Sequence, residues 1–176
     1  MIYFIIVFIG DIMEIERKFL VSTLPDLNNV IFNELKQAYL SFEPEVRIRS
    51  SDDSLFYLAE KSTGDLSRSE IEPQINGVTF QILTSLVQGR IISKTRYYVS
   101  LNNNITAELD IYHGEFEGLI TVETEFKSEK EANEFIVPNW YGKEITYYKN
   151  KNLARCSIEE LKLLLAESIG NSRIRK

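Results

Sequence analysis

Charged residues of one sign recur at alternate positions in six short segments, and this pattern constrains the fold more than any other feature. The six pairs are Glu14/Glu16, Arg47/Arg49, Glu70/Glu72, Lys94/Arg96, Glu108/Asp110 and Glu123/Glu125. In a β-strand, alternate side chains point to the same face, so each pair would place two like charges side by side. Such charges repel one another unless an opposite charge or a ligand compensates them. The pattern indicates strands whose charged faces meet.

The residues between these pairs predict strands along most of the chain and three helices. Alternating polar and apolar residues predict strands over 14–21, 35–42, 46–49, 55–61, 66–75, 91–101, 105–112 and 119–126. Helical spacing predicts a helix over 78–87 that stops at Gly89. Capping boxes at Ser128/Glu131 and Ser157/Glu160 predict helices over 128–135 and 157–169, and residues 139–153 are expected to be irregular. Because short antiparallel strands lose their free edges by closing on themselves, we expect an α+β, mainly β, closed barrel with a few flanking helices.

Length and the start of the chain predict one domain. The chain has 176 residues, enough for one sizeable core, and we expect a single domain over residues 13–176. Residues 1–12 form an apolar leader that is too short to cross a bilayer and has no Lys or Arg. Met13 directly precedes the first charged pair. We therefore interpret Met13 as the natural start, with an extra edge strand over 1–12 as the alternative.

Charge and rare residue types exclude several classes of function. The net charge of −6 argues against a nucleic-acid binder or a protein of anionic membrane surfaces. Cys156 is the only cysteine, so an internal disulfide is excluded, which fits a cytoplasmic location. His113 is the only histidine, so a zinc site of His and Cys ligands and a His-based triad are not expected. Any metal would have oxygen ligands, which favours Mg²⁺, Mn²⁺ or Ca²⁺.

Turned inward, the charged strand faces would line a water-filled tunnel with cations beside carboxylates. Unpaired buried charges cost too much free energy for this interior to be a folding core. Arginine and lysine bind phosphate oxygens, and carboxylates bind a hard divalent cation that bridges the same phosphates. The pattern therefore favours a polyphosphate bound together with Mg²⁺. Glu108 and Asp110 could equally be metal ligands or counter-charges of the arginines.

The ordered motifs resemble the CYTH domain superfamily, also called the triphosphate tunnel metalloenzymes. The first is Glu-x-Glu-x-Lys at residues 14–18, the signature of that superfamily. It is followed in family order by Gln37-Ala-Tyr-Leu, Val46-Arg-Ile-Arg, Lys61, Leu66-Ser-Arg-Ser-Glu-Ile-Glu, Lys94-Thr-Arg-Tyr, Glu108-Leu-Asp-Ile-Tyr, Val122-Glu-Thr-Glu-Phe and Tyr148-Lys-Asn-Lys-Asn-Leu-Ala. The set covers residues 13 to about 155 and is most similar to the short bacterial branch, which includes inorganic tripolyphosphatases and members often described as adenylate cyclases. An arginine that relatives usually carry before Tyr-Lys-Asn is missing here.

The resemblance implies an eight-stranded antiparallel tunnel that hydrolyses a triphosphate with Mg²⁺ or Mn²⁺. It implies that the metal ligands come from Glu14, Glu16, Glu72, Glu108, Asp110, Glu123 and Glu125. Substrate phosphates would contact Lys18, Arg47, Arg49, Lys61, Arg68, Lys94 and Arg96. Lys18, Tyr39, Glu125 and Glu70 would act in catalysis, with Tyr39 paired to Lys18 and the two glutamates orienting the attacking water.

The resemblance leaves more than one activity open. Hydrolysis of inorganic tripolyphosphate or of a nucleoside triphosphate is the first expectation. The alternatives are an adenylate cyclase, a thiamine triphosphatase and a non-catalytic polyphosphate-binding module. The expected partner is a small polyphosphate or nucleotide, with no nucleic acid and no membrane, and both a monomer and a homodimer fit the sequence.

Overall fold

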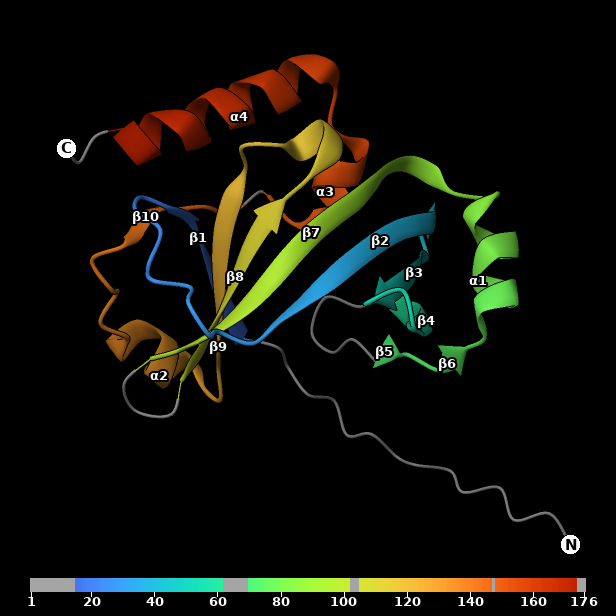
Figure 1. Cartoon of the computed structure of the whole chain (residues 1–176), viewed down its shortest axis with the longest axis horizontal. Coiled ribbons are helices and arrows are strands. Elements are labelled where there is room, and N and C mark those ends of the chain that lie inside the picture. Colours follow the sequence, from blue (N-terminus) through green and yellow to red (C-terminus); the bar gives the residue numbers. More distant parts are fainter. Residues whose placement is uncertain (1–14, 62–69, 102–104, 147, 174–176) are drawn as a thin grey trace, which may run out of the picture.

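A computed structural model describes residues 15–61, 70–101, 105–146 and 148–173, and one antiparallel sheet dominates this part of the chain (Figure 1). The strands are β1 (Ile15–Val21), β2 (Phe32–Phe42), β3 (Glu45–Ser51), β4 (Leu55–Lys61), β5 (Glu70–Ile71), β6 (Gln74–Ile75), β7 (Gln88–Ser100), β8 (Thr106–Tyr112), β9 (Ile120–Phe126) and β10 (Tyr141–Glu144). The helices are α1 (Gly77–Thr84), the 3₁₀ turn η2 (Gly114–Phe116), α2 (Glu129–Glu134), α3 (Asn150–Arg155) and α4 (Ile158–Arg173). The prediction of a mainly β fold with a few helices is confirmed.

The sheet is longer than the eight strands that the resemblance implies. Its strands follow the order β10-β1-β9-β8-β7-β2-β3-β4-β5, and β6 pairs with β4. The described part of the chain therefore contains ten strands, with β10 and β5 at the two ends of the path. No pairing between those two ends occurs among the described residues, so closure into a barrel stays a prediction.

Three segments differ from the elements that the sequence predicts. The single strand expected over 66–75 is divided, because Pro73 lacks an N–H group and separates β5 from β6. Gly89 does not end a helix but lies in β7 with a positive φ of 72°. The stretch expected to be irregular over 139–153 contains β10 and most of α3. These short elements carry too few residues for a clear periodic pattern.

Both predicted helix starts carry their serine cap, and the one at Ser157 is a complete capping box. The Ser157 hydroxyl accepts from the Glu160 amide at 3.1 Å, and the Glu160 carboxylate accepts from the Ser157 amide at 2.7 Å. At the start of α2, the Ser128 hydroxyl accepts from the Glu131 amide at 3.2 Å. The Glu131 carboxylate there accepts from the Lys127 amide instead.

No helix in the described residues is long and apolar enough to cross a membrane.

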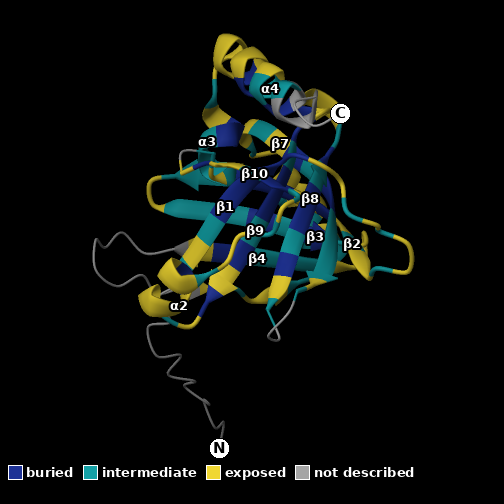
Figure 2. Cartoon of the chain, turned by 90° about the vertical axis from the view of Figure 1, so that its left-hand side faces the viewer, coloured by how far each residue is buried: buried dark blue, intermediate teal, exposed yellow. Residues whose placement is uncertain are grey.

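Two apolar clusters lie on opposite faces of the sheet. The first cluster joins inward positions of β1, β2, β7 and β8 to α3 and α4, and includes Leu20, Tyr39, Ile92, Tyr112, Phe116, Leu119, Ile145, Leu153, Ala154, Leu161 and Leu164. The second contains Phe19, Val21, Ala107, Leu109, Val122 and Tyr141, on the alternate positions of β1, β8 and β9. Figure 2 shows buried residues running along these strands beneath the C-terminal helices. The first cluster fills the space beside α3, and the charges occupy the rest of the same face.

Candidate active site

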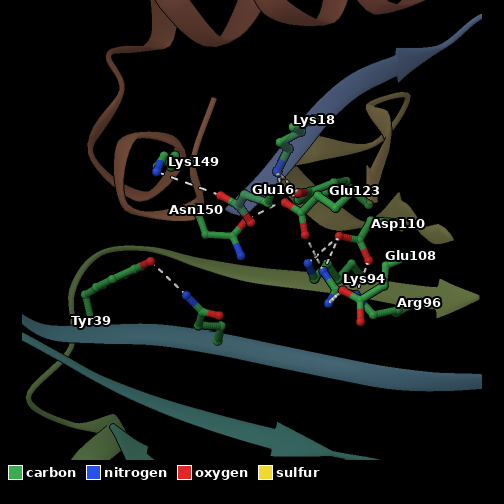
Figure 3. Close-up of polar contacts among 12 residues, drawn as sticks. Glu16, Lys18, Tyr39, Lys94, Arg96, Glu108, Asp110, Glu123, Lys149 and Asn150 are labelled. Atoms are coloured by element: carbon green, nitrogen blue, oxygen red, sulfur yellow. Dashed lines mark hydrogen bonds and ion pairs between the residues drawn. The ribbon is translucent and has the colours of Figure 1, made fainter. Parts of the chain in front are cut away.

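Neighbouring strands bring the predicted charges together on one face of the sheet, which we call the charged face. It is formed by Glu16, Lys18, Arg47, Arg49, Lys94, Arg96, Glu108, Asp110, Glu123 and Glu125. The register pairs Lys18 of β1 with Glu123 of β9, and Arg96 of β7 with Asp110 of β8. Directly opposed residues in antiparallel strands have close side chains, so the alternation in sequence becomes a network of opposite charges. Figure 3 shows this network between residues of β1, β7, β8 and β9.

Asp110 lies at the buried centre of the charged face. Its side chain is 0% exposed, and its Oδ2 accepts from Lys94 Nζ at 2.5 Å and from Arg96 Nη2 at 2.7 Å. Arg96 Nε donates to the other oxygen at 2.7 Å, which completes a two-pronged contact. The carboxylates nearby raise the pKa of Arg96 despite its burial. Arg96 therefore stays cationic in a place that water reaches poorly.

Glu123 connects β1 to this centre. It accepts from Lys18 Nζ at 2.7 Å and from Arg96 Nη2 at 2.9 Å. Burial opposes its negative charge, but Lys18, Lys94 and Arg96 outweigh burial and hold the pKa of Glu123 well below its ordinary value. Burial likewise opposes the ammonium of Lys18, and the carboxylates of Glu123 and Asp110 raise its pKa. Both groups are ionised at neutral pH.

Glu108 is the least favourably placed carboxylate of the network. It accepts from Arg96 Nη1, but burial and the neighbouring Asp110 and Glu123 raise its pKa. In this structure Glu108 and Asp110 are counter-charges of Arg96, which is one of the two roles left open by the sequence. Since both carboxylates face the same cation, a metal role for them stays a prediction.

Arg49 on β3 has donor capacity left over for an anion. Its Nη2 donates to Glu72 Oε2 at 2.8 Å, and its guanidinium lies 5.4 Å from the centre of the Tyr57 ring. Arg49 Nε and Glu72 Oε1 are buried atoms without a hydrogen-bond partner in the described part of the chain. A buried donor without a partner is costly, and a phosphate oxygen is the acceptor that a guanidinium fits best. Arg47 lies two residues earlier on the same face.

The carboxylates near the start of β1 fit a hard divalent cation. Glu16 lies directly opposite Glu125 in the register of β1 and β9, and like charges in that arrangement repel. Lys149 Nζ is 3.8 Å from Glu16 Oε1, a partly exposed and long contact. Carboxylate oxygens are the ligands that Mg²⁺ and Mn²⁺ prefer. No preformed group of three acidic, His or Cys ligands occurs among the described residues, and Glu14 lies outside them.

The expected pair of Tyr39 with Lys18 is not formed in this structure. The Tyr39 hydroxyl accepts from Gln37 Nε2 at 2.7 Å, and burial raises the pKa of Tyr39. The tyrosine beside Lys18 is Tyr112 of β8, whose hydroxyl lies 3.5 Å from Lys18 Nζ. The pairing expectation is therefore corrected: β2 places Tyr39 against the first apolar cluster, and β8 runs closer to β1.

Some expected site residues lie outside the described part of the chain. Glu14 and Arg68 are among them, and so are the side chains of Lys61 and Glu70. The backbone register nevertheless pairs Lys61 of β4 with Glu70 of β5. Sequence reasoning did not single out Tyr112 as a site residue. The signal was present, because Tyr112 continues the alternation of Glu108 and Asp110 on one face of β8.

The chain is similar to known proteins of one kind. The chain is 42% identical over 147 residues to an inorganic triphosphatase of Nitrosomonas europaea, covering 80% of this chain and 96% of that protein. It is 33% identical over 150 residues to an inorganic triphosphatase of Acetivibrio thermocellus, covering 81% and 93%. The crystal structure of an inorganic triphosphatase superposes with a TM-score of 0.67 at 39% identity, covering 82% of this chain and 95% of that one. A scan against protein-family models finds no match.

The fold and the charged face together define a CYTH-like protein of the triphosphatase type. More narrowly, the chain belongs to the inorganic triphosphatase family, because two relatives above 30% identity match along nearly their whole length.

Proposed function

We propose that this protein hydrolyses inorganic tripolyphosphate to pyrophosphate and phosphate with the help of a divalent metal. The observation that carries the proposal is the buried network in which three cations, Lys18, Lys94 and Arg96, are held in place by three carboxylates, Glu108, Asp110 and Glu123. A solely structural network would satisfy every buried polar atom, but Arg49 Nε and Glu72 Oε1 have no partner in the described residues. Arg49 thus has a donor left over for a polyanion.

The cations of the charged face would bind and orient the phosphate chain. Arg49 can donate hydrogen bonds to phosphoryl oxygens, and Arg96 and Lys94 contribute positive charge beside them. These donors are held by neighbouring carboxylates before substrate arrives, so they need little reorganisation when charge builds on the leaving pyrophosphate. Their main contribution is to stabilise that charge and to hold the terminal phosphorus in line for attack.

The carboxylates would hold the metal and the attacking water. Glu16, Glu123 and Glu125, joined by Glu14, would bind Mg²⁺ or Mn²⁺, which neutralises phosphate charge and lowers the pKa of bound water. Water then forms the new P–O bond at the terminal phosphorus, the bridging P–O bond breaks, and the proton of water passes to solvent or to a carboxylate such as Glu125. Closure of the sheet into a tunnel over residues 13–176 is part of this proposal, since it would exclude bulk water.

The substrate and the metal are tested in one set of assays. Phosphate release is measured from tripolyphosphate, ATP and thiamine triphosphate, each with Mg²⁺ and with Mn²⁺. We expect turnover with either metal and complete loss of it in EDTA. Full activity in EDTA would refute the metal requirement, and a wild-type protein that cleaves none of the three substrates would refute the proposed function.

A further inference from the structure

Tyr112 is a buried tyrosine that contacts two lysines of the charged face. Its side chain is 0% exposed, and its hydroxyl lies 3.5 Å from Lys18 Nζ. Lys94 Nζ lies over the same ring, 5.5 Å from its centre, in a cation–π contact. The two lysines come from β1 and β7, and Tyr112 comes from β8. One aromatic side chain therefore contacts cations from two other strands.

Asn150, the first residue of α3, fixes the direction of the hydrogen bonds around Tyr112. The Tyr112 hydroxyl donates to Asn150 Oδ1 at 3.2 Å. A phenol has a single proton, so once that proton is given to Asn150 the hydroxyl can only accept on its other side. A lysine ammonium can only donate. The chain of donation therefore runs from Lys18 to Tyr112 to Asn150, and Figure 3 shows Asn150 reaching toward the charged face from the C-terminal segment.

The remaining contacts of Lys18 leave one donor for substrate. In the described part of the chain its ammonium donates to Glu123 at 2.7 Å and to Tyr112 at 3.5 Å. An ammonium has three N–H groups, so these two acceptors determine where the third one points. Without the Tyr112 hydroxyl, the ammonium could turn about its bond to Glu123. The third donor would then lose its fixed direction.

We propose that Tyr112 and Asn150 are positioning residues that hold Lys18 and Lys94 in the orientation needed to bind the triphosphate in the transition state. The inference rests on the proposed function and extends it, because it makes α3 a functional part of the site. Asn150 belongs to the same helix as Leu153 and Ala154, which are buried in the first apolar cluster. Packing of α3 on the sheet thereby sets the position of the acceptor for Tyr112.

The test compares two substitutions that each remove one buried tyrosine hydroxyl. Tyr112→Phe breaks the link from Lys18 to Asn150, and it should lower kcat for tripolyphosphate about tenfold, the kinetic equivalent of one hydrogen bond to a charged group. KM should change less than twofold, because Glu123 still holds Lys18 near the substrate. Tyr141→Phe is the matched control: its hydroxyl lies 2.8 Å from Thr124 in the second cluster, on the opposite face. That variant should keep the wild-type kcat.

A double-substitution cycle separates positioning from a loss of packing. Asn150→Ala should lower kcat to a similar extent, and the double variant should be no slower than Tyr112→Phe alone, because both break the same chain. Asn150→Asp keeps an oxygen acceptor and should retain most of the activity. All variants are assayed well below their melting temperatures. If Tyr112→Phe is less stable but has the wild-type kcat, the positioning role is overturned while the proposed function stands; an inactive wild type would overturn the proposed function itself.

Discussion

At the scale of single residues, opposite charges determine which side chains are ionised on the charged face. Glu123 has a depressed pKa because Lys18, Lys94 and Arg96 outweigh its burial. Glu108 has a raised pKa because burial and the neighbouring carboxylates outweigh the attraction of Arg96 and Lys94. The negative charge of Glu123 therefore stabilises the folded state. The negative charge of Glu108, which lies opposite Glu123 on the paired strand, destabilises it.

The pH dependence of stability should show this difference. The folded-state pKa of Glu123 is below its ordinary value of 4.5, so its contribution is present above pH 4.5 and is lost as the pH falls toward the folded-state pKa. Glu123→Gln should lower the free energy of unfolding at pH 7 by about 3 kcal/mol, because it leaves Lys18 buried beside a neutral amide. The difference in unfolding free energy between the wild type and Glu123→Gln should shrink below pH 4.5. Urea unfolding of both proteins at several pH values measures this difference.

Glu108→Gln is the control for that series. Because the pKa of Glu108 is raised, its ionised form costs stability above its ordinary pKa, and the amide should be tolerated far better at pH 7. Equal losses for the two variants, or a Glu123→Gln deficit that is constant from pH 7 to pH 3, would contradict the assignment of charges.

Arg49 and Arg17 offer a comparison between the two faces of the sheet. Arg49→Ala removes a donor expected to contact the substrate and should lower kcat for tripolyphosphate roughly 10²–10³-fold, as in other preorganised electrostatic sites. Arg17 makes a two-pronged ion pair with Glu144 at 2.8 and 2.6 Å on the other face, away from the charged network. Arg17→Ala should leave kcat unchanged. Similar rates for both variants would remove Arg49 from the site.

At the scale of elements, β7 and α3 meet at a point where no side chain fits. Gly89 in β7 has a φ of 72°, and a Cβ there would lie 2.3 Å from the carbonyl oxygen of Ala154 in α3. Gly114 has a φ of 64°, but a Cβ there would meet nothing within 4 Å. Both glycines have a positive φ that other residues rarely adopt. Only at Gly89 would an added side chain also clash with a neighbouring element.

Alanine at these two positions should therefore have different effects. Gly114→Ala should cost only the backbone strain, about 1 kcal/mol of unfolding free energy. Gly89→Ala adds a clash that must displace α3, so it should cost more and should also lower the rate of phosphate release. Thermal unfolding and the phosphate assay measure the two effects. Equal melting temperatures and rates for both variants would show that α3 accommodates the added methyl group.

The elements that the sequence predicted best are those with long alternating patterns or complete caps. The charged pairs of β1, β3, β7, β8 and β9 specify strand and face together, because a slip of one residue would bury every charge on the wrong side. The capping box at Ser157 marks the start of α4. Short elements such as β10 and α3 escaped prediction because tertiary contacts decide them.

At the scale of the whole molecule, the sequence predicted which residues share a face but not which of them touch. Alternation places Lys18 and Glu123 on faces of strands, and only strand order brings β1 next to β9. The contact between Lys18 and Tyr112, and that between Tyr112 and Asn150, join segments far apart in the chain. Such contacts depend on the twist of the sheet and on the position of α3, which no local pattern encodes.

The charged face as a whole favours a bare phosphate chain over a nucleotide. The donors and acceptors of the charged face suit phosphate oxygens and metal, whereas a base needs stacking or apolar walls and an amide edge. The tyrosine rings beside this face, Tyr57 and Tyr112, are already contacted by Arg49 and Lys94. Tripolyphosphate can use every contact that this face makes with phosphates. The nucleoside of ATP would gain no further contacts there. We therefore expect a higher kcat/KM for tripolyphosphate than for ATP.

The most direct test is to follow wild-type protein with Mg²⁺ by ³¹P NMR, once with tripolyphosphate and once with ATP. The account predicts faster loss of tripolyphosphate, with pyrophosphate and phosphate as equimolar first products, and no cyclic nucleotide from ATP. Conversion of ATP to cyclic AMP and pyrophosphate as the main reaction, or inert tripolyphosphate beside rapidly cleaved ATP, would contradict it.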